Sequence, residues 1–421
     1  MRLGLRSSAP WTGSRQSSPK VKLVLHRLEE AASTKIDVFS VQMPSLGHKT
    51  YGTLLRRGFA ESHDIAFEAR WTNDDPEFPA RAANRILWQD VPVRAIYQRN
   101  LDIKRFRADL GISLLSRRLV ECALKRQKID VLHFHTQNAA WLSRSHSARI
   151  PTVITTDQTN AQIALEYPPW TRWSHVPSIA LERRTVHSAS AIVVFSQWGA
   201  DSFIKEYDVP LDRVHVIPVG VELDGFAHFE SRQAGSSDKK RLLFVGGDFR
   251  RKGGPLLVDV FRQKFDRQDV ELHLMTNEPS VATQGNIIVH RNVQPFSAAW
   301  YELYSQADIF VLPTLREAFG IAYIEAMAAG IPVIGTRVSA APEIVSEDVG
   351  FLIEPNDPRA LAERIERLIG DSELRRKLGE NGRARARRLF DAKQHVARLG
   401  DVFEDVAASH ADRAALRRQG A

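Results

Sequence analysis

Cysteine is nearly absent from this chain, because its 421 residues include a single one, Cys122. One cysteine excludes an intrachain disulfide and any zinc site built from cysteine ligands, and it fits a cytoplasmic protein. Cys122 lies in the helix-like run LVECALK, where we expect a small buried side chain rather than a reactive thiol.

Long apolar runs are also missing. We find no stretch of about 18 apolar residues, so we expect no transmembrane helix. The N-terminus, MRLGLRSSAPWTGSRQSSPK, is basic and rich in serine and lacks the apolar core of a secretory signal. We therefore expect a basic, flexible tail over residues 1–34.

Two common nucleotide-binding signatures are absent as well. The P-loop pattern G-x-x-x-x-G-K-[ST] does not occur, and neither does the dinucleotide fingerprint G-x-G-x-x-G. These absences argue against a P-loop nucleotidase and against a nicotinamide or flavin enzyme, so we expect no such cofactor.

Positive charge exceeds negative charge, and the formal net charge is +8. Much of the excess lies between residues 81 and 128, and a basic face there would attract lipid headgroups, nucleic acid or phosphorylated substrates. Dispersed, solvated charges explain the same composition. No nucleic-acid-binding motif is present, so we expect no nucleic acid partner; peripheral contact with the anionic inner face of a membrane is the hypothesis we keep.

Short apolar runs alternate with amphipathic helical patterns along the chain, which predicts parallel βαβ units. We expect strands at 35–43, 130–135, 151–156, 190–196 and 214–218, and again at 241–245, 270–275, 286–290, 308–312, 332–335 and 350–353. The polar run between the two groups indicates a linker at 229–240. An α/β protein with two successive domains, 35–228 and 241–390, is the simplest interpretation, followed by a helix and basic tail over 391–421.

The segment ADIFVLPTLREAFGIAYIEAMAAG predicts a ligand site at the end of a buried strand. A helix follows the loop and ends near Gly330, and a strand–loop–helix junction of this kind binds ligands in open α/β sheets. Gly320 would let a phosphate approach the backbone. Free N–H groups at the helix start would face an anion, and they belong to Ala318, Phe319, Gly320 and Ile321.

Two carboxylates flank this turn. Glu317 lies in the loop, and Glu325 lies eight positions later, inside the helix and among apolar neighbours. A carboxylate in that setting needs hydrogen-bond donors, and sugar hydroxyls would serve. The alternative for Glu325 is a glutamate held by a salt bridge.

The segment LLFVGGDFRRKGG places a cation cluster directly after another strand. Its members are Arg250, Arg251 and Lys252, and glycines lie on both sides of the cluster. Cations on such a turn can neutralise a diphosphate. The alternative is an ordinary surface turn between a strand and a helix.

Together these segments resemble the donor site of the family 4 retaining glycosyltransferases, which have the GT-B fold. Glu317 and Glu325 match the family's E-x7-E pattern, and ADIFVLPT, EAFGI, EAMAAGIPVIGT, PEIV and GFLIEPNDP follow in order. The likeness is close from about 241 to 370 and looser upstream. It implies two Rossmann-like, doubly wound domains that face each other across a cleft, with the acceptor bound by the first and a nucleotide-sugar donor by the second.

The resemblance also implies roles for individual residues. Glu325 would bind the nucleotide ribose, and Glu317 would contact the donor sugar near the reacting carbon. Lys252, assisted by Arg251, would stabilise the leaving diphosphate, so no divalent metal would be needed. The donor-binding set is completed by the four amides named above and by Gly247, Arg250 and Arg291.

The chain departs from the family at three places. Gly247 stands where many members have an arginine. The loop PSLGHKTYG, at 44–52, has the single glycines Gly47 and Gly52 where many members have a glycine pair. Asp157 follows the strand PTVITT where the family often has a histidine. Asp157 could steady positive charge at the anomeric carbon, orient the acceptor or simply cap the next helix.

His133 and His135 share one face of the strand DVLHFH, and we expect them, with Gly47, to line the acceptor pocket. No third ligand is spaced beside them, so we expect no metal site. The donor would be a UDP-sugar or a GDP-sugar, and the acceptor a glycan, a lipid-linked sugar or a small molecule. A GT-B epimerase and a catalytically silent protein that binds sugar nucleotides or polyanions are the alternatives.

Overall fold

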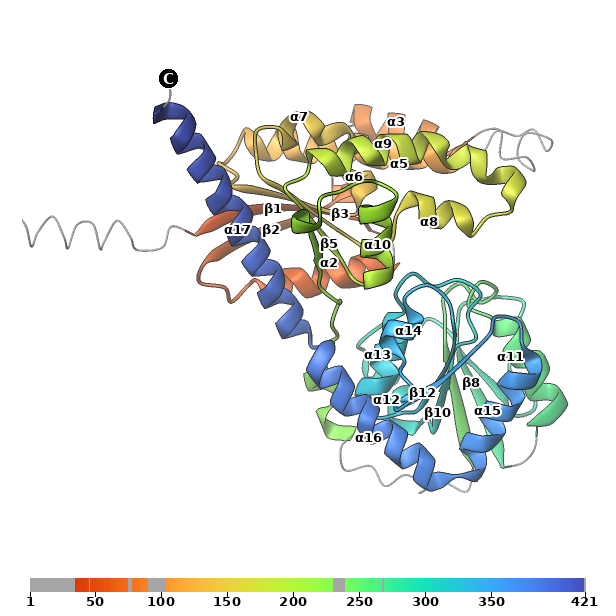
Figure 1. Ribbon diagram of the computed structural model, residues 1–421. Coiled ribbons are helices and arrows are strands. Elements are labelled where there is room, and N and C mark those ends of the chain that lie inside the picture. The colour runs from red at the N-terminus through yellow and green to blue at the C-terminus, as the bar shows by residue number, and fades with distance from the viewer. Residues whose placement is uncertain are drawn as a thin grey trace, which may run out of the picture.

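A computed structural model gives the fold of the chain (Figure 1) and describes residues 35–44, 46–74, 78–89, 103–229, 239–266 and 269–419. The expected tail at 1–34 and most of the expected linker at 229–240, residues 230–238, lie outside the described residues. The described chain forms two halves, each built around a six-stranded parallel sheet that is covered by helices.

The first sheet has the strand order β2-β1-β3-β4-β5-β6. Its strands are β1 (Ile36–Gln42), β2 (Ile65–Trp71), β3 (Val131–His135), β4 (Thr152–Thr156), β5 (Ala191–Val194) and β6 (Val214–Val216). The sequence predicted every one except β2, an edge strand whose side chains are mostly half-buried and include two charges. The strand order reverses between β1 and β3, and ligands bind beyond the carboxyl ends of the strands at such a point.

Helices surround this sheet: α2 (Leu46–Gly58), α3 (Phe78–Leu87), α5 (Lys104–Leu124), α6 (Gln137–Ala140), α7 (Arg144–Ser147), α8 (Asn160–Leu165), α9 (Val176–Ser188) and α10 (Gln197–Lys205). The expected loop at 44–52 is therefore wrong, because Gly47 and Gly52 both lie in α2. That helix buries Tyr51 and Leu55 one turn apart, and this apolar face outweighs the two glycines. Cys122 lies on α5 and is half-buried.

The second sheet has the order β12-β11-β10-β7-β8-β9. All six strands were predicted: β7 (Lys240–Val245), β8 (Val270–Met275), β9 (Ile287–His290), β10 (Ile309–Val311), β11 (Val333–Thr336) and β12 (Gly350–Ile353). The helices of this half are α11 (Gly254–Lys264), α12 (Ala298–Gln306), α13 (Ile321–Ala328), α14 (Ala341–Ile344), α15 (Pro358–Gly370) and α16 (Ser372–Leu389). The order reverses between β7 and β10, at the centre of the sheet.

The last helix, α17 (Ala392–Gln419), returns from the second half and packs on the first (Figure 1). It contacts α2 and the strands β1, β3, β4 and β5, and its Phe403 is fully buried. The segment expected as a helix and tail therefore covers the first sheet. In the described part of the chain, none of the helices has the length and apolarity needed to cross a membrane.

The two halves also touch across their facing edges. Glu343 of α14 accepts hydrogen bonds from the backbone N–H groups of Gln197 and Trp198, both at 2.7 Å. These N–H groups lie in the first turn of α10, where a carboxylate is stabilised by the helix dipole. Phe319 of the second half packs against Phe195 of the first, with ring centroids 5.9 Å apart.

Candidate functional site

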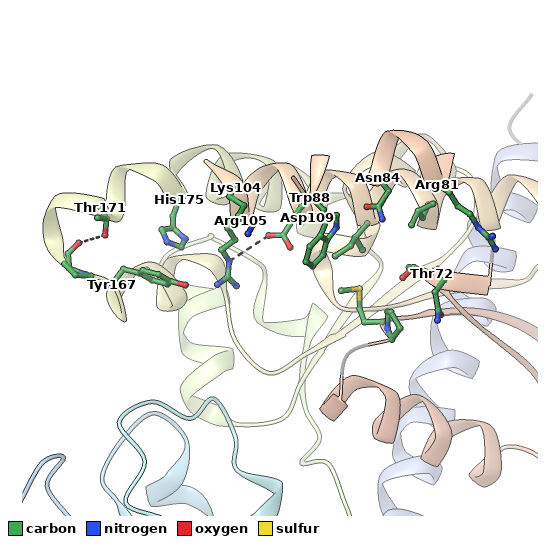
Figure 2. A pocket seen from close by; sticks show the side chains of 17 residues that line it. Thr72, Arg81, Asn84, Trp88, Lys104, Arg105, Asp109, Tyr167, Thr171 and His175 are labelled. Carbon is green, nitrogen blue, oxygen red and sulfur yellow. Dashed lines mark hydrogen bonds and ion pairs between the residues drawn. The ribbon is translucent and has the colours of Figure 1, made fainter. Parts of the chain in front are cut away.

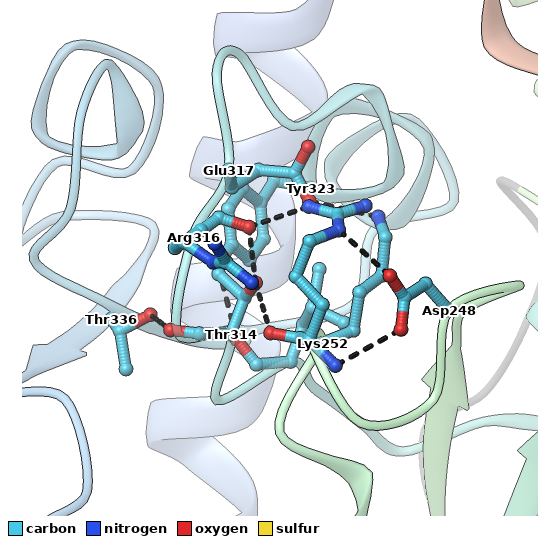
Figure 3. A network of polar contacts seen from close by, with 9 residues as sticks. Asp248, Lys252, Thr314, Arg316, Glu317, Tyr323 and Thr336 are labelled. Atoms are coloured by element: carbon cyan, nitrogen blue, oxygen red, sulfur yellow. Dashed lines mark hydrogen bonds and ion pairs between the residues drawn. The ribbon is translucent and has the colours of Figure 1, made fainter. Parts of the chain in front are cut away.

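Two loops are locked together at the centre of the second sheet, one after β7 and one after β10 (Figure 3). They lie so close that a Cβ on Gly253 would be 1.9 Å from the Pro313 carbonyl oxygen, and Gly253 has a φ of 77°. The Leu315 N–H donates to the Arg251 carbonyl oxygen at 2.9 Å and joins the same loops. Glycine is needed here because a side chain would force the loops apart.

Cations of the first loop surround Glu317 of the second. The Lys252 ammonium lies 2.8 Å from Glu317 Oε2, and the two side chains are only 16% and 13% exposed. Arg251 lies 3.9 Å from the same oxygen and 3.3 Å from Asp248, and it donates to the Arg316 carbonyl oxygen. Two positive side chains and a carboxylate thus meet where the central strands end, the place at which open α/β sheets bind ligands.

Helix α13 begins at the predicted turn. It starts at Ile321, and Gly320 before it has a φ of 94°, so that a Cβ there would lie 2.7 Å from the Tyr323 ring. The helix ends at Ala328, and Gly330 beyond it has a φ of 74°, in agreement with the predicted C-terminal cap. Of the four N–H groups expected to face an anion, those of Gly320 and Ile321 belong to the start of the helix, whereas Ala318 and Phe319 lie in the loop before it.

Glu325 lies on α13 and is 9% exposed. Its Oε2 accepts a hydrogen bond of 2.6 Å from the Tyr304 hydroxyl, and no ion pair joins it to another described residue. The alternative of a salt-bridged glutamate is therefore wrong. Burial raises the pKa of Glu325, whereas Tyr304 and then Lys252 lower it. The influence of Lys252 ties Glu325 to the same polar centre as Glu317.

Asp157 lies directly after β4 and interacts electrostatically with charged groups of both halves. Burial raises its pKa, His48 lowers it and Glu317 raises it further. The next helix, α8, is capped by Thr159, whose hydroxyl accepts from the Gln162 N–H at 3.1 Å in a capping box. The alternative in which Asp157 caps that helix is therefore wrong.

His48 is a site residue that the sequence reasoning missed. It lies in the first turn of α2, and its Nδ1 is 2.8 Å from His135 Nε2. Burial lowers the pKa of His48 and Asp157 raises it. His135 is in turn held by Thr155, whose hydroxyl is 3.0 Å from His135 Nδ1. The available signal was the place of His48, soon after the first strand and therefore at the ligand-binding edge of the sheet.

His133 does not line a pocket. It is fully buried, its Nδ1 lies 2.7 Å from the Ser40 hydroxyl, and its ring packs against Phe403 of α17 at 5.3 Å. His135 is also buried, at 2% exposure, and its Nε2 is in contact with His48 of α2. The expectation that both histidines line the acceptor pocket is wrong, because α17 covers one of them and α2 the other.

Other predicted residues make no described contact with Glu317 or Glu325. Gly247 and Arg250 are exposed on the turn after β7, and Gly47 is exposed on α2 with open space beside it. Arg291 uses its guanidinium to bind the carbonyl oxygens of Glu278 and Val281. None of the described contacts joins Arg291 to Lys252, Glu317 or Glu325.

The basic region between residues 81 and 128 is partly neutralised by acidic neighbours. Arg117 lies 2.8 Å from Glu121, and Lys128 lies 2.6 Å from Asp130. Within the described ranges, no group of three or more His, Cys, Asp or Glu side chains could hold a metal ion.

Two family descriptions match consecutive parts of the chain. Residues 47–224 match "Glycosyltransferase Family 4", and residues 228–385 match "Glycosyl transferases group 1". The first match covers most of the first sheet and the second covers the whole second sheet with its two polar loops. The family that the E-x7-E segment resembles is therefore confirmed.

Curated relatives carry out several sugar transfers. The chain is 29% identical to the MMP alpha-(1->4)-mannosyltransferase of Mycolicibacterium hassiacum, over 54% of this chain and 56% of that protein. It is 27% identical to the D-inositol 3-phosphate glycosyltransferase of Corynebacterium glutamicum, over 68% of this chain and 75% of that protein. The chain thus spans little more than half the length of the first of these relatives.

Solved structures share the fold. The sucrose-phosphate synthase of Thermosynechococcus elongatus superposes with a TM-score of 0.67 at 18% identity, over 89% of this chain and 100% of that chain. HepE of Anabaena, solved in complex with UDP-glucose, gives a TM-score of 0.62 at 18% identity, over 88% of this chain and 100% of that chain. These likenesses confirm the predicted two-domain GT-B fold.

Proposed function

This chain belongs to family 4 of the glycosyltransferases, and on that premise we propose that it transfers a sugar from a nucleotide diphosphate sugar to an acceptor hydroxyl. The observation that carries the proposal is the polar centre at the ends of β7 and β10. Lys252 lies 2.8 Å from Glu317 there, beside the free N–H groups that begin α13. Such a centre combines cations for a diphosphate with a carboxylate for sugar hydroxyls.

In this proposal, Lys252 and Arg251 neutralise the charge that develops on the leaving diphosphate, so the transfer needs no metal ion. Glu325 binds the ribose through Oε1, since Tyr304 already holds Oε2. Asp157 faces the reacting carbon from the first half and steadies its positive charge. The anomeric configuration is retained, as the resemblance to the family implies.

The donor nucleotide is proposed to be UDP, because HepE is solved with UDP-glucose and has the same fold at a TM-score of 0.62. GDP is the competing choice. The acceptor is proposed to be a hydroxyl compound of the kind that the relatives' names describe, a glycan or a small phosphorylated alcohol, or else a lipid-linked sugar.

Peripheral membrane contact is part of the proposal because tryptophans are exposed beside the first half's ligand edge. Trp170 is 74% exposed and Trp173 is 45% exposed, and both lie on the short helix η3 (Pro169–His175) with Arg172 between them. Tryptophan and arginine together suit a membrane interface. Wild-type protein should sediment with phosphatidylglycerol vesicles at low salt, and a Trp170→Ala, Trp173→Ala variant should stay in solution; equal behaviour of both proteins would reject this contact.

A second candidate is a catalytically silent protein that binds sugar nucleotides. Gly247 favours it, because this exposed glycine stands where the resemblance predicts an arginine. The two candidates differ in turnover but share the donor site.

Calorimetric titration with UDP, GDP and ADP, each with and without magnesium, tests the donor site. We expect micromolar binding of one diphosphate without metal, and its loss in Glu325→Ala. Turnover of the matching sugar nucleotide would then separate the enzyme from the silent protein. Absence of binding to all three nucleotides would overturn both candidates.

A further inference from the structure

A cavity of about 910 Å³ lies in the first half of the molecule (Figure 2). It is enclosed by α3, α5, η3 and the residues that follow β1 and β2, so it opens from the same ligand-binding edge that carries Asp157 and His48. Much of its wall is apolar and is formed by Met43, Trp88, Ala108, Ile112, Leu115 and Tyr167. Lys252, Glu317 and Glu325 are not among the residues that line this cavity.

One wall of the cavity carries polar atoms that have no hydrogen-bond partner among the described residues. These atoms are Arg105 Nε, Asp109 Oδ2 and His175 Nδ1, and all three are buried. Arg105 Nε and Asp109 Oδ2 are 4.0 Å apart and neither atom is exposed to solvent, so a small movement of the two side chains would admit a ligand hydroxyl between them. It would accept a hydrogen bond from the guanidinium and donate one to the carboxylate.

The protonation state of Asp109 supports a hydroxyl group as the ligand at this wall. Burial raises the pKa of Asp109 to about 6, and Arg105 opposes that rise. Asp109 is therefore mainly ionised at neutral pH and accepts hydrogen bonds. Arg105 and Asp109 balance each other's charge, so this wall suits a neutral hydroxyl better than an anion.

The cavity adjoins the donor loops. Tyr167 lines it, and the Arg316 guanidinium lies over the Tyr167 ring at 5.8 Å. Arg316 also donates to the Glu166 carbonyl oxygen at 3.3 Å, and it directly precedes Glu317. Burial raises the pKa of Glu166, whereas Arg316, then Arg105 and then Arg251 lower it. Cations from the cavity and from the donor loops thus act on one carboxyl group.

We propose that this cavity binds the acceptor, and that the acceptor is an alcohol which carries a bulky apolar group. This inference rests on the proposed function and names its substrate class. A bare polyol would leave the apolar wall in contact with water, whereas an alkyl or aromatic group would cover it. Such an acceptor could come from a membrane lipid or from a water-soluble aglycone.

Calorimetry with two glucosides tests the substrate class, because octyl β-glucoside carries an apolar chain that methyl β-glucoside lacks. Below its micelle concentration, octyl β-glucoside should bind at least about tenfold more tightly, since burial of about two methylene groups already gives that ratio. Equal affinity of the two glucosides would overturn the proposal.

Substitutions in the cavity wall test whether the glucosides bind in the cavity. Ala108→Phe fills the cavity and should abolish the preference for the octyl compound, while Ala227→Phe, at an exposed position, should keep it. Asp109→Asn should weaken both glucosides severalfold. Circular dichroism and thermal unfolding are measured for every variant, so that a misfolded first half is recognised, and UDP binding is measured to check the donor site. Octyl β-glucoside that binds as tightly to Ala108→Phe as to the wild type would also overturn the proposal.

The outcomes separate this inference from the proposed function. A wild-type protein that binds UDP but shows no preference between the glucosides overturns the acceptor class alone. A wild-type protein that binds no nucleotide overturns the donor site. If the preference is found, vesicle sedimentation that Ala108→Phe weakens identifies a lipid in the cavity as the source, and sedimentation that is unchanged in Ala108→Phe identifies a soluble aglycone.

Discussion

The Lys252 ammonium lies 2.8 Å from the Glu317 carboxylate, at the place where we propose that the diphosphate of the donor binds. We expect Lys252→Ala to lower turnover by roughly 10²-fold or more, because the substitution removes a cation that acts on the leaving group. Steady-state kinetics with the identified donor measures this change. Lys264→Ala, on the exposed side of α11, is the matched control, and an unchanged rate in Lys252→Ala would reject the role.

Asp157 is a residue whose charge and shape can be tested separately. Asp157→Asn should reduce transfer while nucleotide affinity stays nearly unchanged, because Asp157 lies across from the donor loops rather than in them. Thr159→Ala serves as the comparison: it removes the helix cap and should cost about 1 kcal/mol of stability without a selective effect on transfer. Loss of folding in Asp157→Asn would show that the carboxylate is structural.

Single residues also show what the sequence could and could not predict. Glu317, Glu325 and Lys252 could be singled out because each lies within a short segment whose strand, loop and helix follow one another, and their roles at a donor site stay predictions. His133 was misplaced because its cover, Phe403, comes from a helix about 270 positions later, which no local pattern reveals. His48 was overlooked because only the folded sheet brings it next to His135 and Asp157.

At the scale of elements, the turn between β7 and α11 fixes the donor site. Gly253→Ala should destabilise the second half by about 2 kcal/mol or more, because the added Cβ meets the Pro313 carbonyl oxygen and Gly253 has positive φ. Thermal unfolding and UDP titration measure the effect, and donor affinity should fall with stability. Gly370→Ala is the control, because a Cβ there meets nothing within 4 Å. Equal unfolding temperatures for the two variants would contradict the close packing of the loops.

Strands of the second sheet were easy to predict because they are buried apolar runs bounded by polar loops. β2 was missed because an edge strand with half-buried side chains, such as Glu68 and Arg70, lacks a continuous apolar run. The start of α2 was misjudged for the opposite reason. Its glycines suggested a loop, but burial of Tyr51 and Leu55 against the sheet stabilises the helix.

At the scale of the whole molecule, two buried histidines at α17 should make the stability of the fold depend on pH. Burial lowers the pKa of His395 on α17 to about 4 from its ordinary value of 6.5, and the Pro218 carbonyl opposes that shift. The pKa of His133, which lies beneath α17, is lowered to about 3, first by burial and then by His395. The unfolded chain binds protons at these groups before the folded chain does, so stability is full above 6.5 and falls as the pH drops toward 4.

We therefore expect the unfolding temperature to fall between about pH 7.5 and about pH 5, and His395→Gln to reduce that fall. Glutamine can still donate to the Pro218 carbonyl and accept from the Tyr51 hydroxyl, as His395 does. Calorimetric unfolding at the two pH values measures the difference, with His63→Gln at an exposed position as the control. A pH response that is the same in His395→Gln and in the wild type would show that other groups govern acid stability.

The return of α17 has a consequence for the way the chain can be divided. The polypeptide passes between the halves twice, and the two passages are hydrogen-bonded, from the Val221 N–H to the Phe390 carbonyl at 2.9 Å and from the Ala392 N–H to the Val221 carbonyl at 3.1 Å. If the protein were expressed as two pieces, split between residues 229 and 239, the second piece would carry α17, the helix that covers the sheet of the first piece. Leu399 and Phe403 would dock as in the intact chain, so the two fragments should reassemble through α17 together with the contacts between the facing edges of the halves.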